Sequence, residues 1–111
     1  MNIIENFVNG KKFVGLSKRT SKVFNPATGE QTSEVKLATT KDVDTAVKAA
    51  KKAFISWSNK PPLQRARIMF KFKELIEKNS DELTKIIVSE HGKVFDDARG
   101  ELTRGLEVVE F

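Results

Sequence analysis

The residues that could do chemistry gather near the end of the chain, at residues 89–111 (SEHGKVFDDARGELTRGLEVVEF). This stretch contains the only histidine, His91, among acidic and basic side chains. The whole chain has no cysteine, so it offers no thiol nucleophile. A lone histidine at the end of a helix suits the helix dipole as a cation. We therefore expect His91 to be a capping residue and not a catalyst. The stretch shows neither a metal-ligand cluster nor a phosphate-binding loop.

Glu101 and Arg104 are three residues apart, a spacing that brings two side chains together on one helix face. The residues by themselves favour an exposed ion pair between them, which contributes little to stability. A guanidinium group can also hold a carboxylate through two parallel hydrogen bonds. Arg104 is therefore the candidate binding residue of the chain.

A helix over about residues 94–111 must position Arg104. Small and apolar residues recur there at three- and four-residue spacing, at Ala98, Leu102, Gly105 and Val109. Gly92 precedes this helix and can take the positive φ that ends the helix before it. Gly100 and Gly105 each cost a helix about 1 kcal/mol relative to alanine. We therefore expect another element to pack close to the backbone at both glycines.

Three further helices are predicted upstream, over about residues 40–57, 62–78 and 80–91. Thr39 and Asp42 have the spacing of a capping box at the start of the first. Its apolar stripe is Val43, Ala46, Val47, Ala50, Phe54 and Trp57. Residues 79–82 (NSDE) have good N-cap chemistry at the start of the third helix. The inward residues of the third helix are predicted to be Leu83, Ile86 and Ile87.

Strands are predicted within about residues 6–38. Asn9 and Gly10 separate two apolar pairs, which is a strong signal for a hairpin because both residues tolerate positive φ. Residues 25–30 (NPATGE) form a turn, with proline fixing φ and glycine supplying the opposite hand. A few short strands without further partners are only marginally stable in water.

Composition places the chain among soluble, helix-rich proteins. It has 111 residues, 39% of them hydrophobic and 32% charged, with a net charge of +5. The basic residues are scattered among fifteen acids, which indicates solvated helix faces rather than a nucleic-acid site. No apolar run is long enough for a membrane span, and the N-terminus does not resemble a secretory signal. We expect a cytoplasmic protein that binds neither nucleic acid nor membrane.

Several motifs, taken in order, resemble the aldehyde dehydrogenase superfamily. Residues 90–93 (EHGK) look like its E-x-G-K turn, and the hairpin and the NPATGE turn occur in the same order in its members. Residues 100–111 resemble the run G-E-x-x-R-G-x-E-x-V-E-F of the CoA-acylating methylmalonate-semialdehyde dehydrogenases. The resemblance extends over the whole chain but covers only the first part of a family member.

The resemblance implies an α/β fold: a β-hairpin and short strands followed by about four helices, incomplete without the rest of the coenzyme-binding domain. It implies an NAD-dependent oxidation of a semialdehyde to an acyl-CoA, with coenzyme A as co-substrate and loss of carbon dioxide. The cysteine that forms the thioester would lie beyond residue 111. By motif, Arg104 would grip the substrate carboxylate. The complete enzyme would be a homotetramer, with the remainder of the polypeptide as the first partner of residues 1–111.

Three functions remain open from the sequence. The favoured one is a truncated semialdehyde dehydrogenase, inactive by itself, that binds NAD weakly or not at all and associates or partly unfolds in isolation. The second is part of a non-acylating, NAD(P)-dependent aldehyde dehydrogenase, in which an uncharged substrate would leave Arg104 without a role. The third is a stand-alone basic module that binds nucleic acid or another partner. The exact aldehyde is not specified by these residues.

Overall fold

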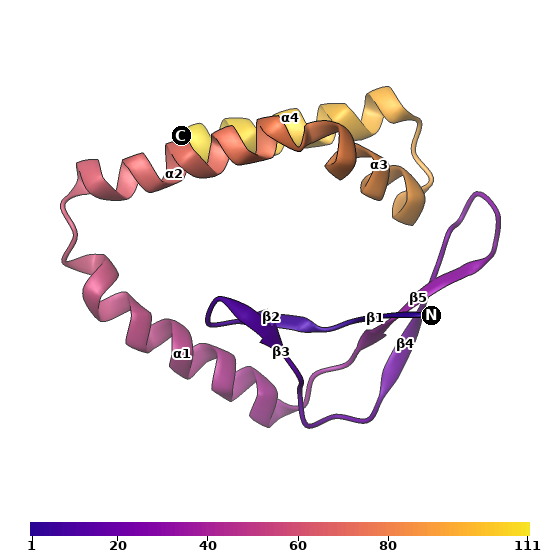
Figure 1. Ribbon diagram of the computed structural model, residues 1–111, viewed down its shortest axis with the longest axis horizontal. Helices are drawn as coiled ribbons and strands as arrows, with labels where there is room; N and C mark the ends of the chain where they lie inside the picture. Colours follow the sequence, from indigo (N-terminus) through magenta and orange to yellow (C-terminus); the bar gives the residue numbers. More distant parts are fainter. The chain divides into compact units, whose positions relative to one another are not determined.

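A computed structural model describes residues 1–111 as short strands followed by four helices, the fold class predicted above (Figure 1). The chain divides into two compact units. Met1–Phe24 and Glu30–Asn59 form the first, which we call the strand unit. Asn25–Gly29 and Lys60–Phe111 form the second, the helix unit.

The strand unit contains two small sheets. In the first, β5 (Gln31–Lys36) lies between β1 (Asn2–Ile4), which runs parallel to it, and β4 (Thr20–Phe24), which runs antiparallel. The second is the predicted hairpin of β2 (Asn6–Val8) and β3 (Lys11–Phe13). Its turn has φ of 54° at Asn9 and 77° at Gly10, as the Asn-Gly signal requires. Sequence reasoning missed β1, because three residues give no periodic pattern and their partner strand is distant in sequence.

Helix α1 (Thr40–Ser58) completes the strand unit and begins with the predicted capping box. The Thr39 side chain accepts a hydrogen bond from the Asp42 backbone N–H, and the Asp42 carboxylate accepts one from the Thr39 backbone N–H at 2.7 Å. The predicted apolar stripe is present on α1, but much of it is exposed: Val43, Val47 and Phe54 are each at least half accessible to solvent. The capping box therefore fixes where α1 begins, although much of the apolar face of the helix is exposed.

The helix unit contains α2 (Pro62–Lys78), α3 (Ser80–His91) and α4 (Phe95–Glu110). Both α2 and α3 contact α4, and Figure 1 shows α4 running alongside α2. The break between α2 and α3 falls at Asn79 as predicted, but the side-chain cap predicted from residues 79–82 does not form at the start of α3. The Asn79 amide donates to the Leu75 carbonyl at 2.7 Å, so it satisfies the end of α2 and leaves the start of α3 without a side-chain cap.

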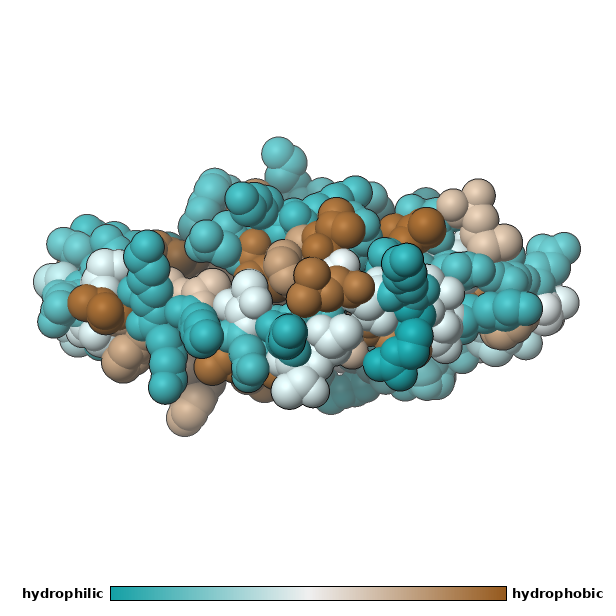
Figure 2. Space-filling model, turned by 90° about the horizontal axis from the view of Figure 1, so that it is seen from below, coloured by the Kyte–Doolittle hydropathy of each residue, from teal (hydrophilic) through white to brown (hydrophobic).

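Few side chains of the helix unit are fully buried. Ala98 of α4 is the one buried apolar residue of the chain, and Thr84 of α3 is completely covered, with its hydroxyl donating to the Ser80 carbonyl at 2.7 Å. The prediction that Ile86 points inward was wrong, since it is 46% exposed. Figure 2 shows one face of the molecule, on which apolar side chains reach the surface among polar ones. Exposed apolar area of this kind favours association.

The predicted close packing at Gly100 and Gly105 was also wrong. A Cβ atom built on Gly105 would meet nothing within 4 Å. One built on Gly100 would lie 3.4 Å from Nη1 of Arg104, a side chain of the same helix. The glycine at 100 therefore leaves room for Arg104 and not for a second element.

Candidate functional site

The candidate site begins at the turn between α3 and α4. Gly92 ends α3 with φ of 81°, and its N–H donates to the Val88 carbonyl at 2.9 Å. His91 occupies the last turn of α3, where we expected it. A Cβ atom built on Gly92 would lie only 2.9 Å from Cγ of Pro26, so the Asn25–Gly29 turn packs directly on this glycine. Both the positive φ and the close proline require glycine here.

Lys93, directly after that turn, forms an ion pair with Glu101 on α4. Both side chains are partly shielded, with 28% of the lysine and 36% of the glutamate side chain exposed. The hydrogen bond that Lys93 donates lowers the pKa of the Glu101 carboxyl and is the largest influence on it. Burial opposes this as the next largest influence, and the nearby charges of Lys93, His91 and Arg104 lower the pKa further. Glu101 is therefore an ionised acceptor that is already engaged by the lysine.

Arg104 lies on α4, three residues after Glu101, but the predicted ion pair between them does not form. Glu101 turns to Lys93 instead, and Arg104 has no ion pair or hydrogen bond through its side chain. Its guanidinium folds back along the helix over Gly100, the direction that long side chains take in helices. The side chain is exposed, so this guanidinium is free to receive an anion from outside these elements.

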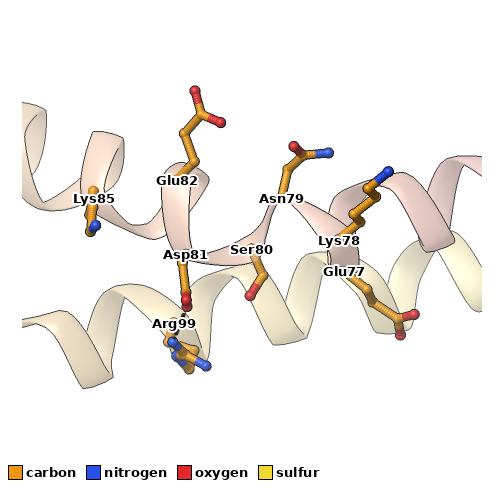
Figure 3. A pocket seen from close by; sticks show the side chains of 8 residues that line it. All are labelled: Glu77, Lys78, Asn79, Ser80, Asp81, Glu82, Lys85 and Arg99. Carbon is orange, nitrogen blue, oxygen red and sulfur yellow. Dashed lines mark hydrogen bonds and ion pairs between the residues drawn. The ribbon is translucent and has the colours of Figure 1, made fainter.

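A second polar feature lies at the junction of α2 and α3. A cavity of about 580 Å³ is lined by charged and polar residues: Glu77, Lys78, Asn79, Ser80, Asp81, Glu82, Lys85 and Arg99. Figure 3 shows Asp81 and Arg99 directed at each other, and the two form an ion pair. Acids and bases balance in this lining, so it has no charge preference for a ligand. Sequence reasoning did not identify this cavity, because its residues lie on three helices.

Asp42 is the most heavily hydrogen-bonded carboxylate of the strand unit. Besides the N–H and hydroxyl of Thr39, it accepts the backbone N–H of Leu16 at 2.9 Å. The N–H of Thr39 lowers its pKa most, followed by that of Leu16. Asp42 is 3% exposed. A carboxylate that is buried and engaged by backbone donors holds the fold together and does not face a substrate.

The remaining chemistry of the chain is limited. No group of three or more histidine, cysteine, aspartate or glutamate side chains is arranged to hold a metal ion. None of the helices combines the length and apolar character needed to cross a membrane. Arg104, next to the Lys93–Glu101 pair, is thus the candidate binding residue that the geometry leaves unoccupied.

Comparisons with known proteins give a consistent result. The sequence pattern of the aldehyde dehydrogenase family matches residues 13–111. Malonate-semialdehyde dehydrogenase 1 of Geobacillus kaustophilus is 44% identical over 109 residues, which are 98% of this chain and 22% of that protein. Among solved structures, a methylmalonate-semialdehyde dehydrogenase from Oceanimonas doudoroffii is 51% identical, with a TM-score of 0.94 over 99% of this chain and 22% of its own.

A further structure matches the whole chain. It is a Sinorhizobium meliloti protein, assigned as a methylmalonate-semialdehyde dehydrogenase and complexed with NAD, with 45% identity and a TM-score of 0.97. The match covers 100% of this chain and 23% of that protein. The chain therefore spans less than a quarter of the length of the relatives it matches.

Proposed function

The chain belongs to the aldehyde dehydrogenase family, and we propose that it forms the N-terminal part of an NAD-dependent, CoA-acylating malonate- or methylmalonate-semialdehyde dehydrogenase. The observation that carries this proposal is the identity of 44% to 51%, over nearly the whole chain, with proteins that bear these names. The relative in complex with NAD supports the choice of coenzyme.

In this proposal the chain contributes binding and not the reactive group. Because the chain contains no cysteine, the thiol nucleophile belongs to another part of the polypeptide, and the 111 residues alone are inactive. NAD would accept the hydride, and coenzyme A would accept the acyl group. Of the residues in this chain, Arg104 would bind the carboxylate of the semialdehyde.

The geometry at Arg104 supports this role. Its guanidinium is exposed, has no anionic partner within the chain and lies over a glycine that leaves it room. A guanidinium fork matches a carboxylate through two parallel hydrogen bonds. An arginine placed in this way discriminates between an aldehyde that carries a carboxylate and one that does not.

The test uses a chimera in which residues 1–111 replace the matching segment of the Oceanimonas doudoroffii enzyme. Arg104→Leu should lower kcat/KM for malonate semialdehyde by roughly 30- to 150-fold, since a shielded, charged hydrogen-bonded contact is worth about 2–3 kcal/mol. The same variant should barely change kcat/KM for propanal. Arg104→Lys should restore only part of the loss, because an ammonium group cannot form the fork.

Glu101→Gln provides the contrast, with an expected change within about twofold for either aldehyde. Equal losses for malonate semialdehyde and propanal in Arg104→Leu would assign Arg104 a structural role.

A non-acylating aldehyde dehydrogenase would yield the free acid whether or not coenzyme A is present. The acyl-transfer step is tested on the enzyme that the native reading frame encodes, by product analysis with and without coenzyme A.

Sequencing the native reading frame past the codon of Phe111 tests the larger assignment. A frame that continues and encodes a cysteine supports a dehydrogenase, whereas a stop codon at that point favours the stand-alone basic module.

We further propose that the complete enzyme is a cytoplasmic homotetramer that binds neither nucleic acid nor membrane. Light scattering of the complete enzyme that gives any mass other than four subunits would contradict the tetramer.

A further inference from the structure

We infer that Lys93 is a positioning residue for the carboxylate site: it holds Glu101 in an ion pair and so keeps Arg104 free for the substrate. The inference rests on the proposed function of Arg104 and adds a residue that acts through another. Lys93 does not itself contact the substrate in this account. It determines which cation Glu101 engages.

Glu101 is the natural competitor of the substrate carboxylate. It lies on the same helix as Arg104 at a spacing where opposite charges meet readily. Without another partner, Glu101 would be expected to pair with Arg104, as the sequence alone suggested. The structure shows the alternative, in which Lys93 reaches Glu101 from the turn between α3 and α4. Lys93 therefore determines whether Arg104 pairs with Glu101 of the same helix or stays free.

The surroundings strengthen this competition. The Lys93–Glu101 pair is partly shielded from water, so the interaction is screened less than one on an open surface. The pKa of Glu101 is lowered, first by Lys93, so the competing carboxylate stays charged at neutral pH. If Lys93 were neutral, an uncompensated negative charge would remain near Arg104. It would both attract the guanidinium and repel a substrate carboxylate.

The position of Lys93 is fixed by the turn that carries it. Gly92 has the positive φ that ends α3, and Pro26 packs against it, so the residue that follows is held by both contacts. The helix unit contains a matched pair elsewhere: Lys73 on α2 binds Glu110 on α4 at 2.6 Å. That second pair also joins two elements, but it lies six residues beyond Arg104 along α4, which makes Lys73 a suitable control.

The kinetic test uses the same chimera with malonate semialdehyde and propanal. Lys93→Met should lower the ratio of kcat/KM for the two aldehydes by about three- to tenfold, mainly through KM for the charged one. Lys93→Met with Glu101→Gln should restore the ratio to within about twofold, because the competitor is then neutral. Lys93→Arg should keep the ratio, and Lys73→Met should leave it unchanged.

The outcomes separate the two hypotheses. If Arg104→Leu shows no selectivity, the proposed carboxylate site fails and Lys93 has nothing to position. If Arg104→Leu is selective but Lys93→Met affects both aldehydes equally, the positioning role is overturned and the carboxylate site stands. The positioning role is also overturned if the ratio is not restored when Glu101→Gln is added to Lys93→Met. If the Lys93–Glu101 ion pair only stabilised the fold, removing its second partner would not restore the ratio.

A second readout uses NMR of the same chimera, with its arginines labelled with 15N, during an acid titration. In Lys93→Met, the Nε–Hε resonance of Arg104 should shift as Glu101 gains its proton, since the two groups are then paired. In the unsubstituted chimera this resonance should shift much less, because Glu101 then pairs with Lys93 and acts on Arg104 only from a distance. The inference would be overturned, whatever the kinetics show, if the Arg104 resonance shifted no more in Lys93→Met than in the unsubstituted protein.

Discussion

In the strand unit a buried carboxylate organises the backbone, whereas in the helix unit partly exposed carboxylates join one element to the next. Asp42 accepts a hydrogen bond from the backbone N–H of Thr39, three residues before it, and one from that of Leu16, 26 residues before it. In the helix unit, Glu101, Glu110 and Asp81 each pair with a cation on another element or turn.

This difference indicates where each unit is sensitive. A buried carboxylate with backbone donors has no substitute, because the donors would be left without partners. Exposed ion pairs each contribute little to stability. They can therefore be rearranged at low cost, and this makes them suitable for controlling a binding residue such as Arg104. We expect loss of the buried carboxylate in the strand unit to affect folding, and changes in the Lys93–Glu101 ion pair of the helix unit to affect selectivity.

The largest expected effect is that of Asp42→Ala. The N–H groups of Leu16 and Thr39 lose their acceptor, and α1 loses half of its capping box. We expect amide exchange at Leu16 and Thr39 to become about tenfold faster or more, and the melting temperature of the strand unit to fall by roughly 10 °C. Hydrogen exchange followed by NMR measures both units in the same sample.

Asp44→Ala is the matched control, because Asp44 is an exposed aspartate two residues further along the same helix. Its amide exchange should remain near that of the unsubstituted chain. If Asp42→Ala accelerated exchange equally in α2 and α4, the two units would unfold together and would not differ in what Asp42 stabilises.

Gly92→Ala should have the next largest effect, in the helix unit. Alanine is strained at φ of 81°, and its Cβ would meet Pro26 at 2.9 Å. We expect a loss of about 1–2 kcal/mol in the free energy of unfolding. Gly105→Ala should have the opposite sign, a gain of about 0.5–1 kcal/mol, because that position is helical and nothing lies within 4 Å. Urea titration of the two variants checks the signs.

The smallest expected effect is a difference in pH dependence. The hydrogen bond that Lys73 donates to Glu110 raises the pKa of Lys73 above its ordinary 10.5. The contribution of this contact to stability is therefore complete below that pH and is lost as the pH rises through the higher folded-state pKa. The pKa of Asp42 is lowered from 3.8, so its contribution is complete above that pH and is lost as the pH falls through the folded-state pKa.

Alkali should therefore loosen the contact between α2 and α4, and acid should loosen the start of α1. Lys73→Met should remove part of the alkaline loss, and Asp42→Asn part of the acid loss, as followed by circular dichroism of thermal unfolding. Glu101 adds an acid-dependent contribution within the helix unit, since its pKa is also lowered. An alkaline loss of the same size in Lys73→Met as in the unsubstituted chain would contradict the assignment to Lys73.

The sequence by itself determined the features that depend on neighbouring residues. The Asn9–Gly10 hairpin, the capping box of Thr39 and Asp42, the helix break at Asn79 and the positive φ of Gly92 follow from local backbone preferences. The family resemblance also followed from sequence and was confirmed by the match over residues 13–111. A short motif identifies such features because every atom it needs lies within a few residues.

Only the tertiary structure decided which partner each polar group takes. It paired β1 with β5, placed the Leu16 N–H on Asp42, and directed Glu101 to Lys93 when the local spacing favoured Arg104. The energy differences between such partners are small for exposed charges. The fold selects among them through the position of a turn, and that position depends on residues as distant in the chain as Pro26 and Gly92.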